Sequence, residues 1–225
     1  MVNTENNTQA GVALPSAESV LELLKLDPDG LMSIKPLSKR LQYQAVVMWL
    51  TDYKCPQEVS NNLEMVKGYL ESFYHLGEVE DWERASQILF IQVPPIRESL
   101  HTQLSRWGYS QESIQLHSTL LGKLDRRWDS LCLNCLAKVY YSLEKYDKAI
   151  DYHQQDLHIA QDIKDRSGEC IALESLGNVY EALGEYDKAI DYYQQSWQIA
   201  KDIGNCDREG GALRNLGSVY EALGE

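Results

Sequence analysis

A segment of this chain is repeated at a fixed spacing of 40 residues. Leu136–Asp165 aligns without gaps on Leu176–Asn205, and 17 of the 30 aligned positions are identical, with the motif YDKAIDY in both copies. Leu216–Glu225 then matches Leu176–Glu185 at nine of ten positions. Similarity at a fixed period indicates a repeat array, in which each unit contacts only its neighbours along the chain.

Each 40-residue unit contains two helical patterns of apolar residues. Breaks at Leu183–Glu185 and at Gly204–Asn205 separate the patterns. The apolar positions of each pattern recur at spacings of three and four, which places them on one side of a helix. The first stripe is Leu173, Leu176, Gly177, Tyr180 and Leu183, and the second is Ala189, Ile190, Tyr193, Trp197, Ala200 and Ile203. A single helix pair cannot bury both of its faces, so we expect the pairs to stack into an α-solenoid.

The run ESLGNVYEALGEYDKAIDYYQQSWQIA resembles the tetratricopeptide repeat in a lengthened, bacterial-like form of about 40 residues. The matching features are Leu176-Gly177, Tyr180, Ala189, Tyr193 and the turn that contains glycine. Leu173 stands where the family has a bulky aromatic residue, and the proline after the second helix is absent. The resemblance implies an all-α fold, an α-solenoid of antiparallel helix pairs in a right-handed superhelix.

The rest of the chain is divided by weaker versions of the same pattern. Residues 127–166 and 167–206 are the clear repeats, 207–225 is half a repeat, and 96–126 is predicted to be a degenerate one. Residues 17–95 are predicted to be a helical lead-in that contains another degenerate repeat around Tyr69–Ala85. Within the lead-in, Pro36–Tyr53 reads as one amphipathic helix with Leu41, Ala45, Met48 and Trp49 inward. Residues 1–16 are polar and are predicted to be a disordered tail.

Composition and charge exclude several classes of protein. Apolar residues make up 44% of the chain and charged residues 24%, which is ordinary for a globular protein. All six prolines lie in the first 95 residues, so the repeats are free of helix breakers. The net charge of −13 would repel nucleic acid and anionic membranes. No apolar run is long enough to span a bilayer, and the N-terminus does not look like a signal peptide, so a cytoplasmic location is expected.

Neither a metal site nor a catalytic site is predicted. The chain has no phosphate-binding glycine loop, no G-x-S-x-G motif and no H-E-x-x-H motif. Cys132 and Cys135 have a C-x-x-C spacing, which could indicate a redox or zinc site, but no second ligand pair accompanies them and they lie inside a helical pattern. The five histidines are scattered along the chain. We therefore expect packed cysteines, no catalysis and no cofactor.

The resemblance implies that the first helix of each unit lines a concave groove that binds a protein or peptide. The stripe next to the packing residues is polar and differs between units, as a recognition surface would. The candidate partner-binding residues are Asn134, Lys138, Tyr141, Glu174, Asn178, Glu181, Arg214, Asn215, Ser218 and Glu221. A solvated helix face would also be polar, so the sequence leaves both interpretations open.

Two functions from different classes fit these features. The first is a non-catalytic scaffold or sensor segment that binds a protein partner. The second is the regulatory part of a larger signalling NTPase or protease, because LQYQAVVMWLTDY and GYLESFYHLGEVEDWERA resemble helices that join such modules to tetratricopeptide arrays in some bacterial proteins. Because the sequence stops at Glu225, between the two helices of a repeat, we expect a fragment of a longer array or an unusual cap, with self-association through an uncovered stripe of Leu216, Tyr220 and Leu223.

Overall fold

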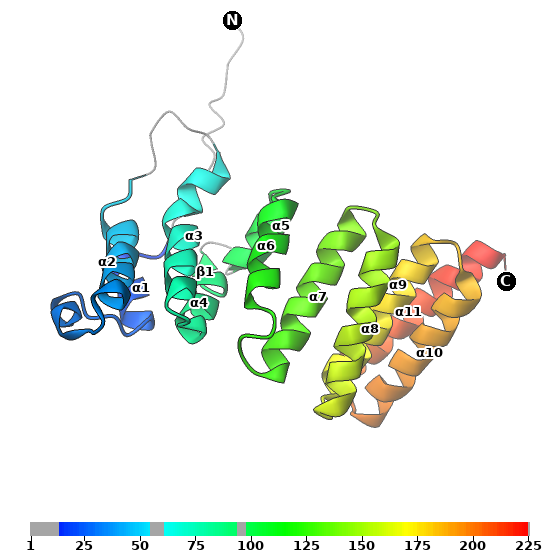
Figure 1. Ribbon diagram of the computed structural model, residues 1–225. Coiled ribbons are helices and arrows are strands. Elements are labelled where there is room, and N and C mark those ends of the chain that lie inside the picture. The colour runs from blue at the N-terminus through cyan, green and yellow to red at the C-terminus, as the bar shows by residue number, and fades with distance from the viewer. Residues whose placement is uncertain (1–13, 55–60, 94–97, 225) are drawn as a thin grey trace, which may run out of the picture. The chain divides into compact units, whose positions relative to one another are not determined.

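The structure is a computed structural model that describes residues 14–54, 61–93 and 98–224 (Figure 1). It divides into two compact units, Met1–Tyr109 and Ser110–Glu225, which are described separately below. Both units are built from helices, as the repeat pattern predicts. Residues 1–13, which make up most of the predicted disordered tail, lie outside the described residues.

The first unit contains short and medium-length helices and an antiparallel pair of two-residue strands. Its elements are α1 (Ala17–Leu23), the 3₁₀ helix η1 (Asp29–Ser33), α2 (Leu37–Thr51), α3 (Asn62–Glu78), α4 (Trp82–Leu89), β1 (Gln92–Val93), β2 (Glu98–Ser99) and α5 (Leu100–Arg106). α1, α2, α3 and α4 contact one another in chain order, and β1 pairs with β2 in antiparallel orientation.

Helix α2 forms where the sequence predicts a helix, but two of its residues face the other way. Leu41 and Met48 were expected to point inward, yet they are 53% and 60% exposed. The buried positions are Tyr43 and Val46. The prediction was wrong because the apolar residues of α2 surround most of the helix. Periodicity alone therefore could not show which side α3 covers.

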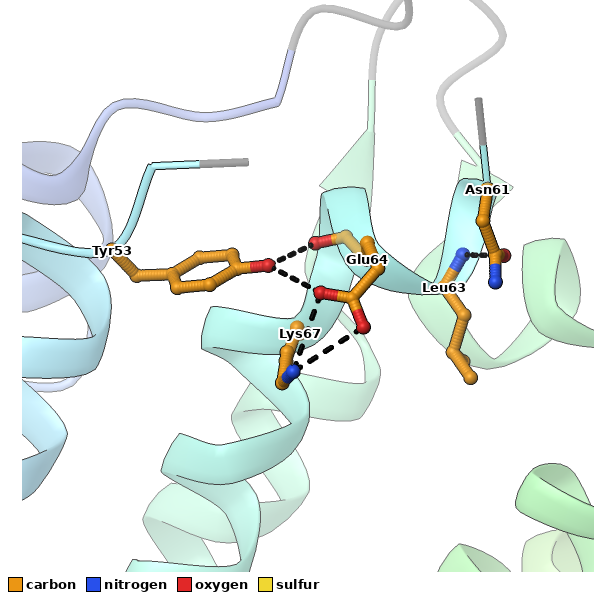
Figure 2. Close-up of polar contacts among 5 residues, drawn as sticks. All are labelled: Tyr53, Asn61, Leu63, Glu64 and Lys67. Atoms are coloured by element: carbon orange, nitrogen blue, oxygen red, sulfur yellow. Dashed lines mark hydrogen bonds and ion pairs between the residues drawn. The ribbon is translucent and has the colours of Figure 1, made fainter. Parts of the chain in front are cut away.

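The end of α2 and the start of α3 are joined by polar contacts (Figure 2). The Tyr53 hydroxyl lies 2.7 Å from Glu64 Oε2 and 3.0 Å from the Glu64 carbonyl oxygen, and Lys67 Nζ lies 3.2 Å from Glu64 Oε1. The hydrogen bond from Tyr53 and the nearby ammonium lower the pKa of Glu64. Asn61 caps α3 by accepting a 2.9 Å hydrogen bond from the Leu63 N–H.

Helices α3 and α4 occupy the segment in which a degenerate repeat is predicted. They contact each other, and the Trp82 ring lies against Gly77, where an added Cβ would be 3.1 Å from two ring carbons. Phe73, Leu76 and Ala85 are fully buried. The pair is thus a helix hairpin closed around a small residue, although its assignment as a repeat stays a prediction.

The second unit is a row of longer helices with short turns. Its elements are α6 (Ser110–Leu120), α7 (Arg126–Ser142), α8 (Tyr146–Asp162), α9 (Arg166–Ala182), α10 (Tyr186–Asp202) and α11 (Cys206–Leu223). Each helix contacts the next one in the chain, and α9 also contacts both α7 and α11 (Figure 1). We call α7–α8 the first repeat and α9–α10 the second repeat. The unit is an all-α solenoid of antiparallel helix pairs.

The repeated sequence produces repeated helix ends. Asp125, Asp165 and Asn205, which are 40 residues apart, cap α7, α9 and α11 by accepting hydrogen bonds from backbone N–H groups. Gly184 and Gly204 adopt left-handed backbone conformations with φ of +74° and +69° at the ends of α9 and α10. The predicted breaks therefore coincide with the observed turns.

The core of the second repeat follows the predicted stripes except at their ends. Leu173, Leu176 and Gly177 are buried on α9, and Ala189 and Tyr193 are fully buried on α10. Leu183 and Ile203 are 40% and 39% exposed because each follows the last residue of its helix.

The stripe predicted for self-association on α11 needs correction at one residue. Leu216 is 9% exposed and packs in the cluster of Tyr180, Ala189, Tyr193 and Val219. Self-association through the C-terminal helix stays a prediction.

Within the described residues, none of the helices combines the length and apolarity needed to cross a bilayer.

Candidate partner-binding face

The ten candidate residues lie on the first helices of successive repeats, α7, α9 and α11. We call these residues the first-helix face. α9 contacts α7 on one side and α11 on the other, so these helices adjoin one another in the solenoid. The face thus crosses three repeats, as a groove in the second unit requires.

Hydrogen bonds connect the α9 and α11 parts of the first-helix face. Asn215 Nδ2 donates to Glu174 Oε1 over 3.4 Å, and Ser218 Oγ donates to Glu181 Oε1 over 3.2 Å. Arg208 Nη1 lies 3.6 Å from Glu174 Oε2. Four of the ten predicted residues are therefore brought into direct contact across two repeats.

Tyr193 of α10 contacts two residues of the first-helix face from the interior of the second repeat. Its hydroxyl lies 2.7 Å from Asn178 Oδ1 and 2.6 Å from Glu181 Oε2. Burial raises the pKa of Tyr193, with the Glu181 carboxylate adding to the effect, so the phenol stays protonated and remains a donor. Asn178 and Glu181 are consequently fixed before any partner binds.

The first repeat has a different polar group below the face. Asp156 of α8 is 2% exposed and accepts hydrogen bonds from Asn134 Nδ2, over 3.1 Å, and from Ser130 Oγ. Burial raises the pKa of Asp156, whereas the two hydrogen bonds oppose the shift. The Asn134 amide is thus held by the interior of the repeat.

Six residues of the face are exposed to solvent: Lys138, Tyr141, Asn178, Arg214, Ser218 and Glu221. Within the part of the chain that the structure describes, neither Lys138 nor Arg214 has an ion pair, so both cations are available to a ligand. An open pocket of about 360 Å³ beside Glu174 and Arg208 adds a concave site at the start of α11.

Sequence reasoning missed the residues that support the face. Tyr193, Asp156 and Arg208 were absent from the candidate set, because the first was assigned to core packing and the other two were not singled out. Comparing the two repeats at the 40-residue offset would have suggested two of them: Tyr193 aligns with His153, and Ser196 aligns with Asp156. A charge or a hydroxyl at a core position of a helix needs a partner.

The C-x-x-C pair lies in the middle of α7. Burial raises the pKa of Cys132 to about 12, and desolvation raises the pKa of Cys135 to about 11. A reactive cysteine pair needs the opposite shift, since the thiolate is the nucleophile and the metal ligand. The environment thus favours cysteines that serve as packing residues.

Stacked antiparallel helix pairs with a repeated sequence frame define an α-solenoid repeat protein. The tetratricopeptide repeat family matches residues 129–202 and 168–225, which together contain most of α7 and all of α8, α9, α10 and α11. Residues 129–225 therefore consist of tetratricopeptide repeats. Tetratricopeptide repeats are a protein-interaction fold. No curated protein shows significant similarity to the chain.

Several solved structures share the fold at low sequence identity. BtubC (BKLC) from P. vanneervenii is 18% identical, with a TM-score of 0.62 over 93% of this chain and 80% of that one. The apo form of RapI is 12% identical, with a TM-score of 0.52 over 92% and 67%.

The third structure is PH0952 from Pyrococcus horikoshii, a signal transduction ATPase with numerous domains that has a tetratricopeptide repeat sensor. It is 17% identical, with a TM-score of 0.50 over 92% of this chain. This chain spans only 38% of the length of PH0952. At these identities the three likenesses establish the fold alone.

Proposed function

We propose that the chain is a non-catalytic scaffold or sensor segment that binds a protein or peptide on the first-helix face. The observation that carries this proposal is the contrast between a constant frame and a variable face. The packing residues Leu136, Val139 and Tyr140 recur unchanged at the 40-residue offset in all three first helices, whereas one face position reads Lys138, Asn178 and Ser218. Variation at the face beside these constant packing positions supports recognition over simple solvation.

The face offers a partner both fixed and mobile groups. Asn178 and Glu181 are held by Tyr193, so they present hydrogen-bonding groups without further loss of side-chain freedom. The exposed cations Lys138 and Arg214 are available to carboxylates of the partner. Because Glu174 and Glu221 lie on the same face, the best ligand is an extended peptide with mixed charges. A clamp for a single carboxylate would need more cations.

A comparison of matched charge reversals tests the proposal. Partners would be captured from native cell extract with the wild-type chain, with Lys138→Glu plus Arg214→Glu, and with a control, Lys145→Glu plus Lys164→Glu. The four substituted residues, Lys138, Arg214, Lys145 and Lys164, are all exposed, and the two double variants change the net charge equally. Lys145 and Lys164 flank α8 and lie outside the face. We expect the face variant to lose the partner and the control to retain it. Equal recovery with both variants would overturn the proposed face.

The second candidate function is that this segment is the sensor of a larger signalling NTPase or protease. It is supported by the likeness to PH0952, whose tetratricopeptide repeats form a sensor in a multidomain ATPase. A Walker-type or protease module in the same gene or operon would favour this function. ATP hydrolysis by the purified chain alone would contradict the non-catalytic assignment.

A further inference from the structure

The first unit contains a pocket whose charge is opposite to that of the whole chain. It has a volume of about 430 Å³ and is formed by the turn after α1, the 3₁₀ helix η1, the start of α2 and one residue of α4. Among the described residues, four cations and one carboxylate line it: Lys25, Lys35, Lys39, Arg84 and Asp27. Positive charge gathered in a hollow attracts anions, even in a chain with a net charge of −13.

Three of the four cations have no counter-charge from the chain. Within residues 14–54, 61–93 and 98–224, no ion pair includes Lys25, Lys35 or Lys39. The carboxylate of Asp27 is engaged by the backbone, because its Oδ1 accepts a 3.0 Å hydrogen bond from the Asp29 N–H. The three ammonium groups are therefore available to a ligand.

The fourth cation, Arg84, is held in place by the fold. Its Nη1 lies 2.6 Å from Asp81 Oδ2, and its Nε donates to the Leu24 carbonyl oxygen over 2.5 Å. The Tyr43 hydroxyl also donates to Asp81, over 2.7 Å. Arg84 thus adds positive charge to the pocket, but neither pair of its neighbouring nitrogens is wholly free for a bidentate contact with a carboxylate.

The ring of Tyr43 lies between α2 and α4 and holds two of the cations near the pocket. The guanidinium carbon of Arg84 is 6.0 Å from the ring centroid, and Lys39 Nζ is 5.9 Å from it. In addition, α2 begins between Lys35 and Lys39, and no side chain caps its first N–H groups. The positive end of the helix dipole therefore adds to the field of the lysines.

The free donors of the pocket suit a phosphate group better than a carboxylate. An ammonium is a compact point charge, whereas recognition of a carboxylate favours the planar fork of arginine, which is engaged here. A phosphate monoester also carries nearly two negative charges at neutral pH, which matches three free lysines better than a single charge does.

The apolar part of the lining indicates that the ligand has an organic group. Leu26 and Leu31 line the pocket beside the lysines, and both are buried. Pockets for small organic ligands have volumes of about 300 to 1,000 Å³, and this pocket falls in that range. A bare phosphate ion would leave the leucines without a contact.

We propose that this pocket is a binding site for a phosphate monoester. Lys25, Lys35 and Lys39 contact the phosphate oxygens, and the organic group of the ligand lies against Leu26 and Leu31. The pocket belongs to the first unit and the first-helix face to the second, so this inference does not rest on the proposed protein-binding function. A phosphate monoester can come from a free metabolite or from a phosphorylated side chain of a partner.

Isothermal titration calorimetry of the full chain with phenyl phosphate, in a buffer without phosphate, tests the proposal. We expect phenyl phosphate to bind more tightly than benzoate, which has the ring but a single charge, and more tightly than inorganic phosphate, which lacks the ring. A capped pentapeptide with a central phosphoserine separates the two sources. Tighter binding of the peptide than of phenyl phosphate would assign the site to a phosphorylated partner, and weaker binding would assign it to a free metabolite.

Single lysine substitutions locate the binding site. Lys25→Gln and Lys39→Gln should each lower the affinity for phenyl phosphate by roughly tenfold, because each removes a charge-assisted hydrogen bond. Lys164→Gln is the matched control for Lys25→Gln. Both lysines are exposed and follow a helix in a left-handed conformation, with φ of +51° at Lys25 and +58° at Lys164. The control belongs to the second unit and should bind like the wild type.

Three results would overturn the proposal. The first is no binding of phenyl phosphate, or binding no tighter than that of benzoate. The second is unchanged affinity in both Lys25→Gln and Lys39→Gln. The third is an equal loss of affinity in Lys25→Gln and Lys164→Gln, since binding would then depend on the overall charge of the chain and not on the pocket.

Discussion

The first and second repeats share a backbone frame but have different interiors. Where the second repeat seats Tyr193 against Gly177, the first repeat has His153 and Ala137 at the equivalent positions. Where the second repeat has the pair Ser196 and Cys170, whose side chains lie 3.1 Å apart, the first has Asp156 with Ser130. The same cap residue at Asp125 and Asp165 thus coexists with substitution in the core.

The difference shows that ring size and the size of the facing residue change together. A tyrosine requires glycine opposite it, whereas a histidine stands with alanine. It also shows that the two repeats support the first-helix face with different buried polar groups. The second repeat supports the face with a neutral phenol, whereas the first supports it with the buried carboxylate of Asp156 and has the buried His153 in place of the phenol. The first repeat should therefore respond to pH where the second does not.

The largest expected effect is acid destabilisation of the first repeat through His153. This side chain is 2% exposed, and burial, with a smaller contribution from Lys138, lowers its pKa from 6.5 to about 4. The unfolded state binds the proton more tightly, so stability is complete above pH 6.5 and is lost as the pH falls towards 4. The loss should amount to about 3 kcal/mol. Urea denaturation of the wild type and of His153→Gln across this range measures it.

His158→Gln is the matched control for this experiment, because His158 lies on the same helix but its side chain is 74% exposed. The control should follow the wild type. Burial also lowers the pKa of His117 in the same unit, so some acid sensitivity should remain in every variant. An unchanged pH profile in His153→Gln would show that His153 does not titrate in this range.

The frame of the repeats could be predicted from sequence, because it depends on local patterns. The 40-residue offset located α7–α11, the turns at Gly184 and Gly204, and the stripe of Leu173, Leu176 and Gly177. These features need only helix periodicity and residues that tolerate left-handed turns. The inward side of α2 was assigned wrongly at Leu41 and Met48, because which side of a helix is covered depends on its neighbours.

The sequence could locate the candidate face but not the buried residues that contact it. The stripe position alone placed Asn215 and Glu174 on adjoining helices, where they form a hydrogen bond. By contrast, the contact between Tyr193 and Glu181 joins two helices whose relative rotation the sequence does not specify. The same applies to Asp156 and Asn134. Contacts between helices depend on packing geometry, which a single sequence does not encode in its spacing.

A smaller effect is expected from adding a methyl group at Gly177 of α9 or at the equivalent Gly217 of α11. Gly177→Ala should destabilise the chain by roughly 1–3 kcal/mol, because its Cβ would enter the Tyr193 ring. Gly217→Ala should instead stabilise it by about 0.5–1 kcal/mol, since alanine favours the helix and the site is open. Thermal or urea denaturation would measure both changes.

Combining Gly177→Ala with Tyr193→His recreates the pair found in the first repeat. A double-mutant cycle should give a favourable coupling energy between the two substitutions, because the smaller ring leaves room for the methyl group. Additive effects would show that ring size and the facing residue are independent.

The smallest expected effect comes from the turn that joins the two helices of each repeat. Glu144 adopts a left-handed conformation with φ of +55°, whereas its equivalent Gly184 has φ of +74°. A non-glycine residue in the left-handed region costs about 1–2 kcal/mol of folding free energy. Glycine avoids this cost but loses more backbone entropy on folding, which offsets part of the gain. Glu144→Gly should therefore stabilise the chain by up to about 1 kcal/mol, and Gly184→Glu should destabilise it by a similar amount. Measuring both substitutions by urea denaturation compares the turns directly. If both substitutions destabilise, each turn depends on contacts of its own residue, and the two repeats differ in their backbone frame as well as in their interiors.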